Sequence, residues 1–539
     1  MPRVLRRLGT GWVVAGCVAL CIPAVVADPA LAPMPAVISS QALLASPALA
    51  PRPALARSPT SVRLVLGPGT VTGPIAQGFL GLALEYSGIR QWVGPGTAAN
   101  PVLAQLIHNL DPVGRPNIRI GGLSTDRSWW PVPGMAKPLG VTDTLSPAWA
   151  QALLTLARSV NAQLVMGVNL EANSPRLAQT EANEFLSLIG RRYVSALDIG
   201  NEPPLYSSVP WYRREGGRVL PWYSDAGTPV FSRDLRWGPP SFVSEYARIL
   251  DALPRIPIAG PDTQRASWFA AYGRFLSPHS RVRALVSHGY GLNNCVTNPA
   301  SAAYPSVPHL LDDYALHDLL NTLTPYIGDA HRDGAAFRID EMGSVTCNGR
   351  AGVADTMASA LWGLGALFSV AQDGVDGVNL HTYPGLTNAL FDFSDSASGW
   401  RGTVHPLYYG ALVFAQAAPA GSRLLHVSAS GPSWLHGWAT TGPGRARHVV
   451  LLNDSLNRSA SVAVRAPRGT LGSGPARLER LSAPSAYATS GITLGGHSFG
   501  ATRTGILPVA VRDDVAAHGG AYRVRVPPAS AAVLTFSAR

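Results

Sequence analysis

Three glutamates stand at or just beyond the ends of short apolar segments, a position from which an acid could face a substrate. They are Glu85, Glu202 within Asn201-Glu202-Pro203, and Glu341. Two carboxylates on opposite sides of a cleft can cleave a glycosidic bond: one is protonated and donates to the leaving oxygen, while the other is ionised and attacks the anomeric carbon or activates water. The residue types therefore predict a glycosidase.

The surroundings of two of these acids differ. Glu202 is expected to be the acid/base. Glu341 follows Asp340 and lies near Arg338, and a nearby cation favours the ionised carboxylate that a nucleophile needs. Tyr290 could donate a hydrogen bond to that carboxylate. The sequence contains no Gly-x-Ser-x-Gly elbow, Walker loop or His-Glu-x-x-His motif.

The elements that would position these residues repeat along residues 78–415. Short uninterrupted apolar segments, typical of strands covered on both faces, alternate with amphipathic helical patterns. The expected strands are 78–85, 117–122, 163–169, 196–201, 256–260, 284–290, 336–341 and 375–381. The expected helices are 101–110, 148–160, 181–189, 241–253, 309–323 and 352–370. Eight such units predict a closed (β/α)8 TIM barrel, whose active site lies at the C-terminal ends of the strands.

A different pattern begins near residue 416. Short β-like segments separated by Gly, Pro and Ser predict a C-terminal antiparallel β-sandwich over 416–539. The N-terminal strand segment 61–77 is expected to pack on this sandwich. An open doubly wound sheet is the alternative to the barrel, but the sequence after the first strand lacks the glycine-rich turn typical of that fold.

The N-terminus is expected to direct export. Residues 1–27 combine a basic start with an apolar stretch and small residues, as a signal peptide does, and 28–60 is a Pro/Ala-rich linker. A lipoprotein anchor at Cys17 and a permanent membrane span are the alternatives. The predicted location is secreted or periplasmic/cell-envelope. The net charge of +11 is spread along the chain without a basic block, which argues against nucleic-acid binding.

Beyond the predicted signal peptide only Cys295 and Cys347 remain. An isolated pair in an oxidising compartment is most simply a disulfide, with two buried thiols as the alternative. Two cysteines without a histidine cluster do not make a zinc site. No metal and no organic cofactor are expected.

The order of these motifs resembles glycoside hydrolase family 79, which contains β-glucuronidases and heparanase, within the clan of retaining (β/α)8 glycosidases. The matching stretches are 118–126 (IRIGGLSTD), 197–206 (LDIGNEPPLY), 288–290 (HGY) and 337–344 (FRIDEMGS). The resemblance implies that Glu202 is the acid/base, Glu341 the nucleophile and Tyr290 the residue that positions the nucleophile.

The same resemblance implies a set of substrate contacts. Glu85 would hold sugar hydroxyls, and Asn201 the hydroxyl beside the reacting carbon. Tyr383, with backbone N–H groups near Asn348 and Gly349, would bind the glucuronate carboxylate. The expected function is thus a secreted retaining β-glucuronidase acting on glucuronic-acid-containing glycans or glucuronides. The loop 345–350 lacks the family's run of glycines, so a neutral-sugar β-glycosidase of the same clan stays open, as does a non-catalytic glycan-binding protein.

Overall fold

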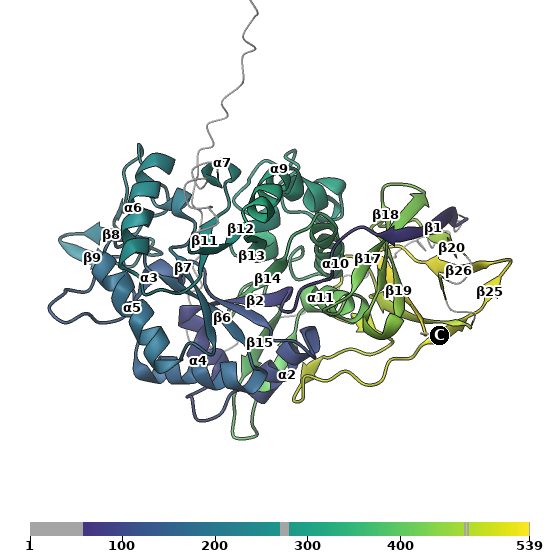
Figure 1. The fold of residues 1–539 in the computed structure, drawn as a ribbon, viewed down its shortest axis with the longest axis horizontal. Coiled ribbons are helices and arrows are strands. Elements are labelled where there is room, and N and C mark those ends of the chain that lie inside the picture. The colour runs from purple at the N-terminus through teal and green to yellow at the C-terminus, as the bar shows by residue number, and fades with distance from the viewer. Residues whose placement is uncertain (1–57, 270–279, 468–469, 472–473, 538–539) are drawn as a thin grey trace, which may run out of the picture. The chain divides into compact units, whose positions relative to one another are not determined.

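The computed structural model describes residues 58–269, 280–467, 470–471 and 474–537 (Figure 1). Residues 58–539 form one compact unit. The predicted signal peptide, the Cys17 site and the linker up to residue 57 lie outside the described residues. Within the described part of the chain, no helix is long and apolar enough to cross a membrane.

Eight parallel strands close into a barrel, which confirms the predicted (β/α)8 fold. The strands follow one another around the barrel in sequence order, and the last strand, β14, pairs with the first, β2. The strands are β2 (Leu80–Glu85), β3 (Asn117–Gly121), β6 (Gln163–Val168), β7 (Val194–Ile199), β11 (Ile258–Thr263), β12 (Val282–Asn293), β13 (Ala336–Thr346) and β14 (Gly377–Thr382). Most residues in them are buried, which explains why the sequence shows them as largely apolar segments.

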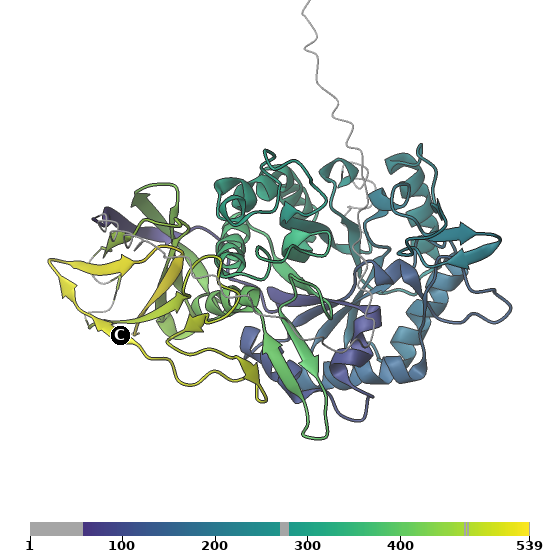
Figure 2. The same ribbon diagram turned by 180° about the vertical axis from the view of Figure 1, so that it is seen from behind.

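Helices surround the barrel (Figures 1 and 2). They are α1 (Ile89–Val93), α2 (Pro101–Leu110), α3 (Ser124–Arg127), α4 (Pro147–Val160), α5 (Pro175–Leu188), α6 (Pro239–Ala252), α7 (Ala266–Phe269), α8 (Val307–Leu310), α9 (Asp313–Arg332), α10 (Met357–Gln372) and α11 (Pro406–Ala417). Ser146 and Ser174 cap α4 and α5 at their N-termini, and each is followed by a proline at the first helical position. Helices α10 and α11 are buried nearly all round.

Those two buried helices face the C-terminal β domain. Phe368 of α10 stacks on Trp438 with ring centroids 5.1 Å apart, and the Thr440 hydroxyl donates to the carbonyl of Ala417. The absence of a polar face on α10 follows from this, because the barrel covers one side of the helix and the β domain contributes to covering the other.

The C-terminal domain is a largely antiparallel sheet of eleven strands, as predicted. Its strands are β17 (Arg423–Ser430), β18 (Leu435–Thr441), β19 (Arg447–Asn453), β20 (Ala460–Arg465), β21 (Ala476–Ser482), β22 (Thr493–Leu494), β24 (Asp513–Val515), β25 (Ala517–His518), β26 (Ala521–Val526), β27 (Ser530–Phe536) and β1 (Thr60–Thr70). Strand β1 lies between β17 and β20, and it runs parallel to β20. Val62, Leu64 and Leu66 of β1 enter the core of this domain.

Several short elements complete the fold. The loop after β7 carries a small sheet of its own, and β23 of the C-terminal region pairs with β16. These elements are β4 (Ser128–Trp129) with β5 (Asp143–Thr144), β8 (Tyr212–Glu215), β9 (Arg218–Leu220) and β10 (Thr228–Val230), and β15 (Phe391–Ser394), β16 (Arg401–Val404) and β23 (Ala501–Thr502). The 3-10 helices are η1 (Tyr86–Gly88), η2 (Pro203–Leu205) and η4 (Pro443–Arg445).

Candidate active site

The acids named from the sequence meet at the C-terminal end of the barrel. Glu85 ends β2, Glu202 follows β7, and Glu341 lies on β13 directly beside His288 of β12 in the parallel ladder. Glu202 adopts a left-handed backbone conformation with φ of 44°, which a non-glycine residue adopts only when its surroundings impose it. This backbone directs the chain into η2, of which Glu202 is the N-cap.

Glu341 is held by donors on both oxygens. The Tyr290 hydroxyl donates to Oε1 at 2.7 Å, and Nη1 of Arg119 donates to Oε2 at 2.8 Å. Burial alone would raise the pKa of the Glu341 carboxyl. The positive charges of His288, His381 and Arg119 outweigh burial and hold its pKa well below the usual range. Glu341 is therefore ionised at neutral pH, as a carboxylate nucleophile must be.

Glu202 has a different environment. Its Oε1 lies 2.9 Å from Nδ1 of His288, and its side chain keeps 19% of its surface exposed, against 9% for Glu341. The other ring nitrogen of His288 lies 2.7 Å from Oδ1 of Asp262. Burial would lower the pKa of His288, but the charges of Glu341 and Asp262 raise it well above its ordinary value. A raised pKa favours the doubly protonated ring, which can donate to Glu202 and Asp262 at the same time.

The two glutamates are close enough to act on one bond. One oxygen of Glu202, one of Glu341 and a ring nitrogen of His288 all lie within 4.8 Å of one another. Carboxyl groups about 5 Å apart are typical of retaining glycosidases, whereas inverting enzymes separate them by roughly 6.5–9.5 Å to admit a water molecule.

Beneath the glutamates lies a buried charge network that sequence reasoning missed. Arg119, fully buried on β3, donates from Nη2 to Oδ1 of Asn201 at 2.8 Å and to Asp262, and its Nε lies 3.4 Å from Asp198 and 3.6 Å from Asp340. Burial, with the charge of Asp262, raises the pKa of Asp340 to about 8. A signal was present: Arg119 stands between two isoleucines in a strand predicted to be buried on both faces. A buried arginine needs acidic partners.

The opposite side of the site is built around Glu85. Its oxygens accept from the backbone N–H groups of Leu123 at 3.2 Å and Ser124 at 2.8 Å, and also from the Ser124 hydroxyl. Nε2 of His381 lies 3.3 Å from the same carboxylate, and its Nδ1 lies 3.2 Å from the Tyr290 hydroxyl. His381 therefore joins Glu85 to the residue that holds Glu341, a link that sequence reasoning did not assign.

Asp126 fixes the turns that lead into the site. Its Oδ1 accepts from the backbone N–H groups of Leu170 and Glu171, at 2.8 and 3.0 Å. Its Oδ2 accepts from the Asn201 N–H at 2.9 Å and the Tyr206 hydroxyl at 2.6 Å. The residue orients the chain that leads into Glu202.

The remaining predicted contacts lie on two loops of the rim. Cys347, Asn348 and Gly349 all have positive φ, and the Asn294 amide donates to the carbonyls of Cys347 at 3.3 Å and Gly349 at 2.8 Å. Among the residues that the structure describes, none accepts from the N–H groups of Asn348 or Gly349. Gly349 packs against the loop that follows Tyr383: a Cβ there would lie 3.0 Å from the nitrogen of Asn388.

Tyr383 is half-buried, and the Ser87 hydroxyl donates to its oxygen at 3.4 Å. Among the residues that the structure describes, no hydrogen bond joins Tyr383 to either catalytic glutamate. Arg350 lies with its guanidinium 4.7 Å from the centre of the Tyr304 ring.

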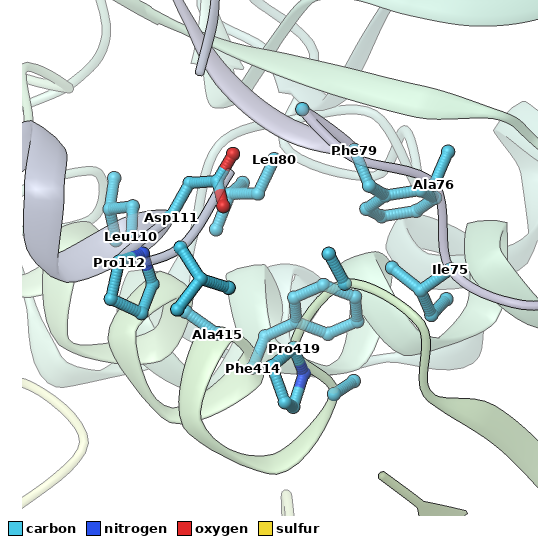
Figure 3. Close-up of a pocket in the computed structure, with 14 residues that line it drawn as sticks. Ile75, Ala76, Phe79, Leu80, Leu110, Asp111, Pro112, Phe414, Ala415 and Pro419 are labelled. Atoms are coloured by element: carbon cyan, nitrogen blue, oxygen red, sulfur yellow. The ribbon is translucent and has the colours of Figure 1, made fainter. Parts of the chain in front are cut away.

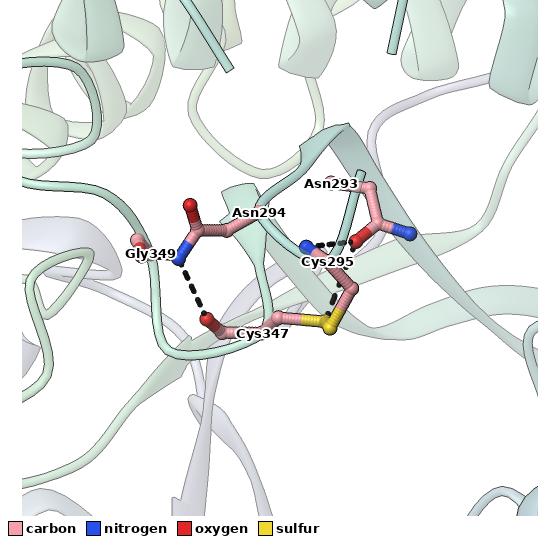
Figure 4. The surroundings of a disulfide bond; sticks show 5 residues. All are labelled: Asn293, Asn294, Cys295, Cys347 and Gly349. Carbon is pink, nitrogen blue, oxygen red and sulfur yellow. Dashed lines mark hydrogen bonds between the residues drawn. A yellow bond between two sulfur atoms is a disulfide. The ribbon is translucent and has the colours of Figure 1, made fainter. Parts of the chain in front are cut away.

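The predicted disulfide is confirmed. Cys295 and Cys347 are bonded, with Cα atoms 5.9 Å apart and a sequence separation of 52 (Figure 4). The bond ties the loop after β12 to the loop after β13. The Asn293 side chain accepts from the backbone N–H of Cys295 at 2.8 Å, so both ends of the bridge are fixed at the rim.

Two sets of three side chains in the described residues bring possible metal ligands together: Glu202, His288 and Glu341, and Asp262, His288 and Asp340. Both sets share His288, whose nitrogens already donate to carboxylates. A doubly protonated imidazole has no lone pair for a metal. The residues present fit an ion-pair network better than a metal centre.

A separate hollow lies at the start of β2, at the other end of the strand from Glu85. Its walls are mostly apolar and include Ile75, Phe79, Leu110 and Phe414, with Asp111 as the charged residue among them (Figure 3). The cavity volume is about 20 Å³, room for about one water molecule. It is too small to hold a sugar.

Residues 437–533 match the model of the "Glycosyl hydrolase family 79 C-terminal beta domain". No curated protein sequence matches the chain.

Solved structures share the fold at low identity. A 4-O-α-L-rhamnosyl-β-D-glucuronidase from Fusarium oxysporum is 17% identical with a TM-score of 0.63, covering 88% of this chain and 100% of that chain. A GH51 arabinofuranosidase from Xanthomonas axonopodis pv. citri is 14% identical with a TM-score of 0.58, covering 88% and 99%. A family 51 α-L-arabinofuranosidase from Bifidobacterium longum is 12% identical with a TM-score of 0.59, covering 89% and 100%. The findings confirm the resemblance to family 79 and support a glycoside hydrolase that carries the family's C-terminal β domain behind a (β/α)8 barrel.

Proposed function

We propose that this protein is a retaining β-glucuronidase that acts by double displacement. The observation that carries the proposal is the pair of carboxylates within 4.8 Å of each other, of which Glu341 is held ionised by Arg119 and Tyr290. Glu202, the more exposed of the two, is placed to exchange a proton with the leaving group and then with water.

The reaction would proceed in two steps. A Glu341 oxygen attacks the anomeric carbon while protonated Glu202 donates to the glycosidic oxygen, which leaves with the aglycone. Glu202, now a carboxylate, then takes a proton from water as the water attacks the glycosyl-enzyme and releases the sugar. Tyr290 keeps the Glu341 carboxylate in a fixed orientation through both steps, and Glu85 and Asn201 would hold sugar hydroxyls.

Uronate specificity would come from the rim loops. The N–H groups of Asn348 and Gly349 have no acceptor within the described residues, and a substrate carboxylate is a suitable one. Tyr383 would donate its hydroxyl from the adjoining loop. The glucuronidase among the similar structures favours the same substrate class. The arabinofuranosidases among them keep a neutral-sugar β-glycosidase as the second candidate.

We further propose that the protein is exported to the cell envelope or beyond. The disulfide between Cys295 and Cys347 supports this location, because such bonds persist in oxidising compartments.

A panel of chromogenic aryl glycosides tests the proposed function on the purified protein lacking residues 1–27. We expect hydrolysis of the β-glucuronide well above the glucoside, galactoside and xyloside, with the β-anomer of the sugar as the first product by proton NMR. Preference for a neutral sugar would favour the second candidate, first release of the α-anomer would refute retention, and binding without turnover would refute the enzyme.

A further inference from the structure

Asp262 ends up beneath both catalytic glutamates, although it touches neither side chain directly. Its Oδ2 accepts from Nη2 of Arg119, and its Oδ1 accepts from Nε2 of His288 at 2.7 Å. The side chain has no exposed surface. Each of its oxygens thus contacts a cation, and the side chain also contacts the buried acids Asp198 and Asp340.

Each of those cations reaches one glutamate. Arg119 continues from Nη1 to Oε2 of Glu341 at 2.8 Å, and His288 continues from Nδ1 to Oε1 of Glu202 at 2.9 Å. A third link is made by the backbone, because the N–H of Glu202 donates to the carbonyl of Asp262 at 2.9 Å. A single residue therefore joins the two glutamates along two hydrogen-bonded arms.

The backbone supports a positional role. Asp262 has φ of 60° and Glu202 has φ of 44°, both in the left-handed region. For a residue with a side chain this conformation is energetically unfavourable. Such costs are retained where the surrounding contacts fix a geometry that function needs, and here the two left-handed residues are bonded to each other.

We propose that Asp262 is a positioning residue for both catalytic glutamates, acting on Glu341 through Arg119 and on Glu202 through His288. The inference rests on the proposed glycosidase mechanism. Since the Nδ1–H of His288 occupies Oε1 of Glu202, the proton transferred to the leaving group sits on Oε2. When Glu202 has given up that proton, the same N–H stabilises the carboxylate that must activate water.

The other groups around Asp262 supply a matched control. The charged or titratable side chains that face it are Arg119 on β3, Asp198 on β7, His288 on β12 and Asp340 on β13. Asp198 is equally buried, and its Oδ2 lies 3.4 Å from Arg119, but no hydrogen bond joins it to His288. Asp198 also contacts Asp262, so Asp198→Asn disturbs Arg119 and Asp262 while it leaves both hydrogen bonds of His288 in place.

The experiment compares Asp262→Asn with Asp198→Asn on two substrates that the wild type hydrolyses, a 4-nitrophenyl and a phenyl glycoside. The phenyl substrate needs proton donation to its leaving oxygen and the nitrophenyl substrate barely does. We expect Asp262→Asn to lower kcat/KM about 100-fold for the phenyl and about 10-fold for the nitrophenyl substrate. Asp198→Asn should lower both by one common factor. When Glu202→Gln is added to Asp262→Asn, the ratio between the kcat/KM losses on the phenyl and the nitrophenyl substrate should not increase further.

A purely structural role gives different results. Equal losses of kcat/KM on both substrates for Asp262→Asn would overturn the proposal. If thermal unfolding shows that this variant does not fold, His288→Asn replaces it, because this variant keeps the contact between Asp262 and Arg119. His288→Asn must then lower kcat/KM more for the phenyl than for the nitrophenyl substrate. A wild type that cleaves no glycoside would instead refute the proposed function, so the two failures are distinguishable.

Discussion

Replacing Tyr290 by Phe removes one hydroxyl from the site and tests how Glu341 is held. The hydroxyl donates to Oε1 of Glu341 at 2.7 Å. The Tyr290 ring packs against Gly343, and the phenyl ring of the variant keeps this contact. A hydrogen bond to a charged group contributes about 1.5–3 kcal/mol. At about 1.4 kcal/mol per tenfold change, we expect kcat/KM to fall roughly 10- to 150-fold.

The assay is the steady-state hydrolysis of a 4-nitrophenyl glycoside, with Tyr383→Phe as the contrast. The Tyr383 hydroxyl contacts Ser87 at 3.4 Å and no glutamate within the described hydrogen bonds. Tyr383→Phe should raise KM for the glucuronide and leave kcat nearly unchanged, whereas Tyr290→Phe should lower kcat. A fall of less than threefold for Tyr290→Phe would refute the reasoning that its hydroxyl orients the nucleophile.

Three further predictions follow from the same structure. Glu202→Gln should slow phenyl glycosides at least tenfold more than 4-nitrophenyl glycosides, and equal losses in kcat/KM would contradict its role as the acid. Loss of the Cys295–Cys347 bond in Cys295→Ser/Cys347→Ser should destabilise the fold by about 4 kcal/mol in the chain-entropy model, measured by denaturant unfolding; two alkylatable thiols in the native protein would contradict the bond itself. Burial raises the pKa of Glu181 to about 8, so its contribution to stability is present below about pH 4.5 and is lost as the pH rises through 8; Glu181→Gln should flatten the fall in Tm over that window, and an unchanged pH profile of Tm would contradict it.

The barrel was predictable because its strands are buried on both faces. Segments such as 117–122 and 163–169 are apolar at most positions, and the structure places β3 and β6 on them. Strands β17 and β18 were not among the β-like segments predicted for this domain. In β17, Arg423, His426 and two serines interrupt the apolar residues, and exposed positions fall on both faces of the strand. No continuous apolar segment therefore marks it.

The candidate site was predictable in its residue types and less so in its connections. Glu202, Tyr290 and Glu341 were identified because each stands at or near a strand end beside recognisable neighbours. Asp262 was missed because the expected strand 256–260 ended before it, whereas β11 continues to Thr263. Which acids surround Arg119 depends on the closure of the barrel, and a sequence does not show which distant strands become neighbours.

The central claim is that Glu341 attacks the sugar and carries it as a covalent intermediate. An activated 2-deoxy-2-fluoro-glucuronide slows the second step of a retaining enzyme more than the first, so the intermediate accumulates. Peptide mass spectrometry of the inactivated protein should place the sugar on Glu341, and Glu341→Gln should remain unlabelled. A label on Glu202, or turnover with no label on any residue, would contradict the account.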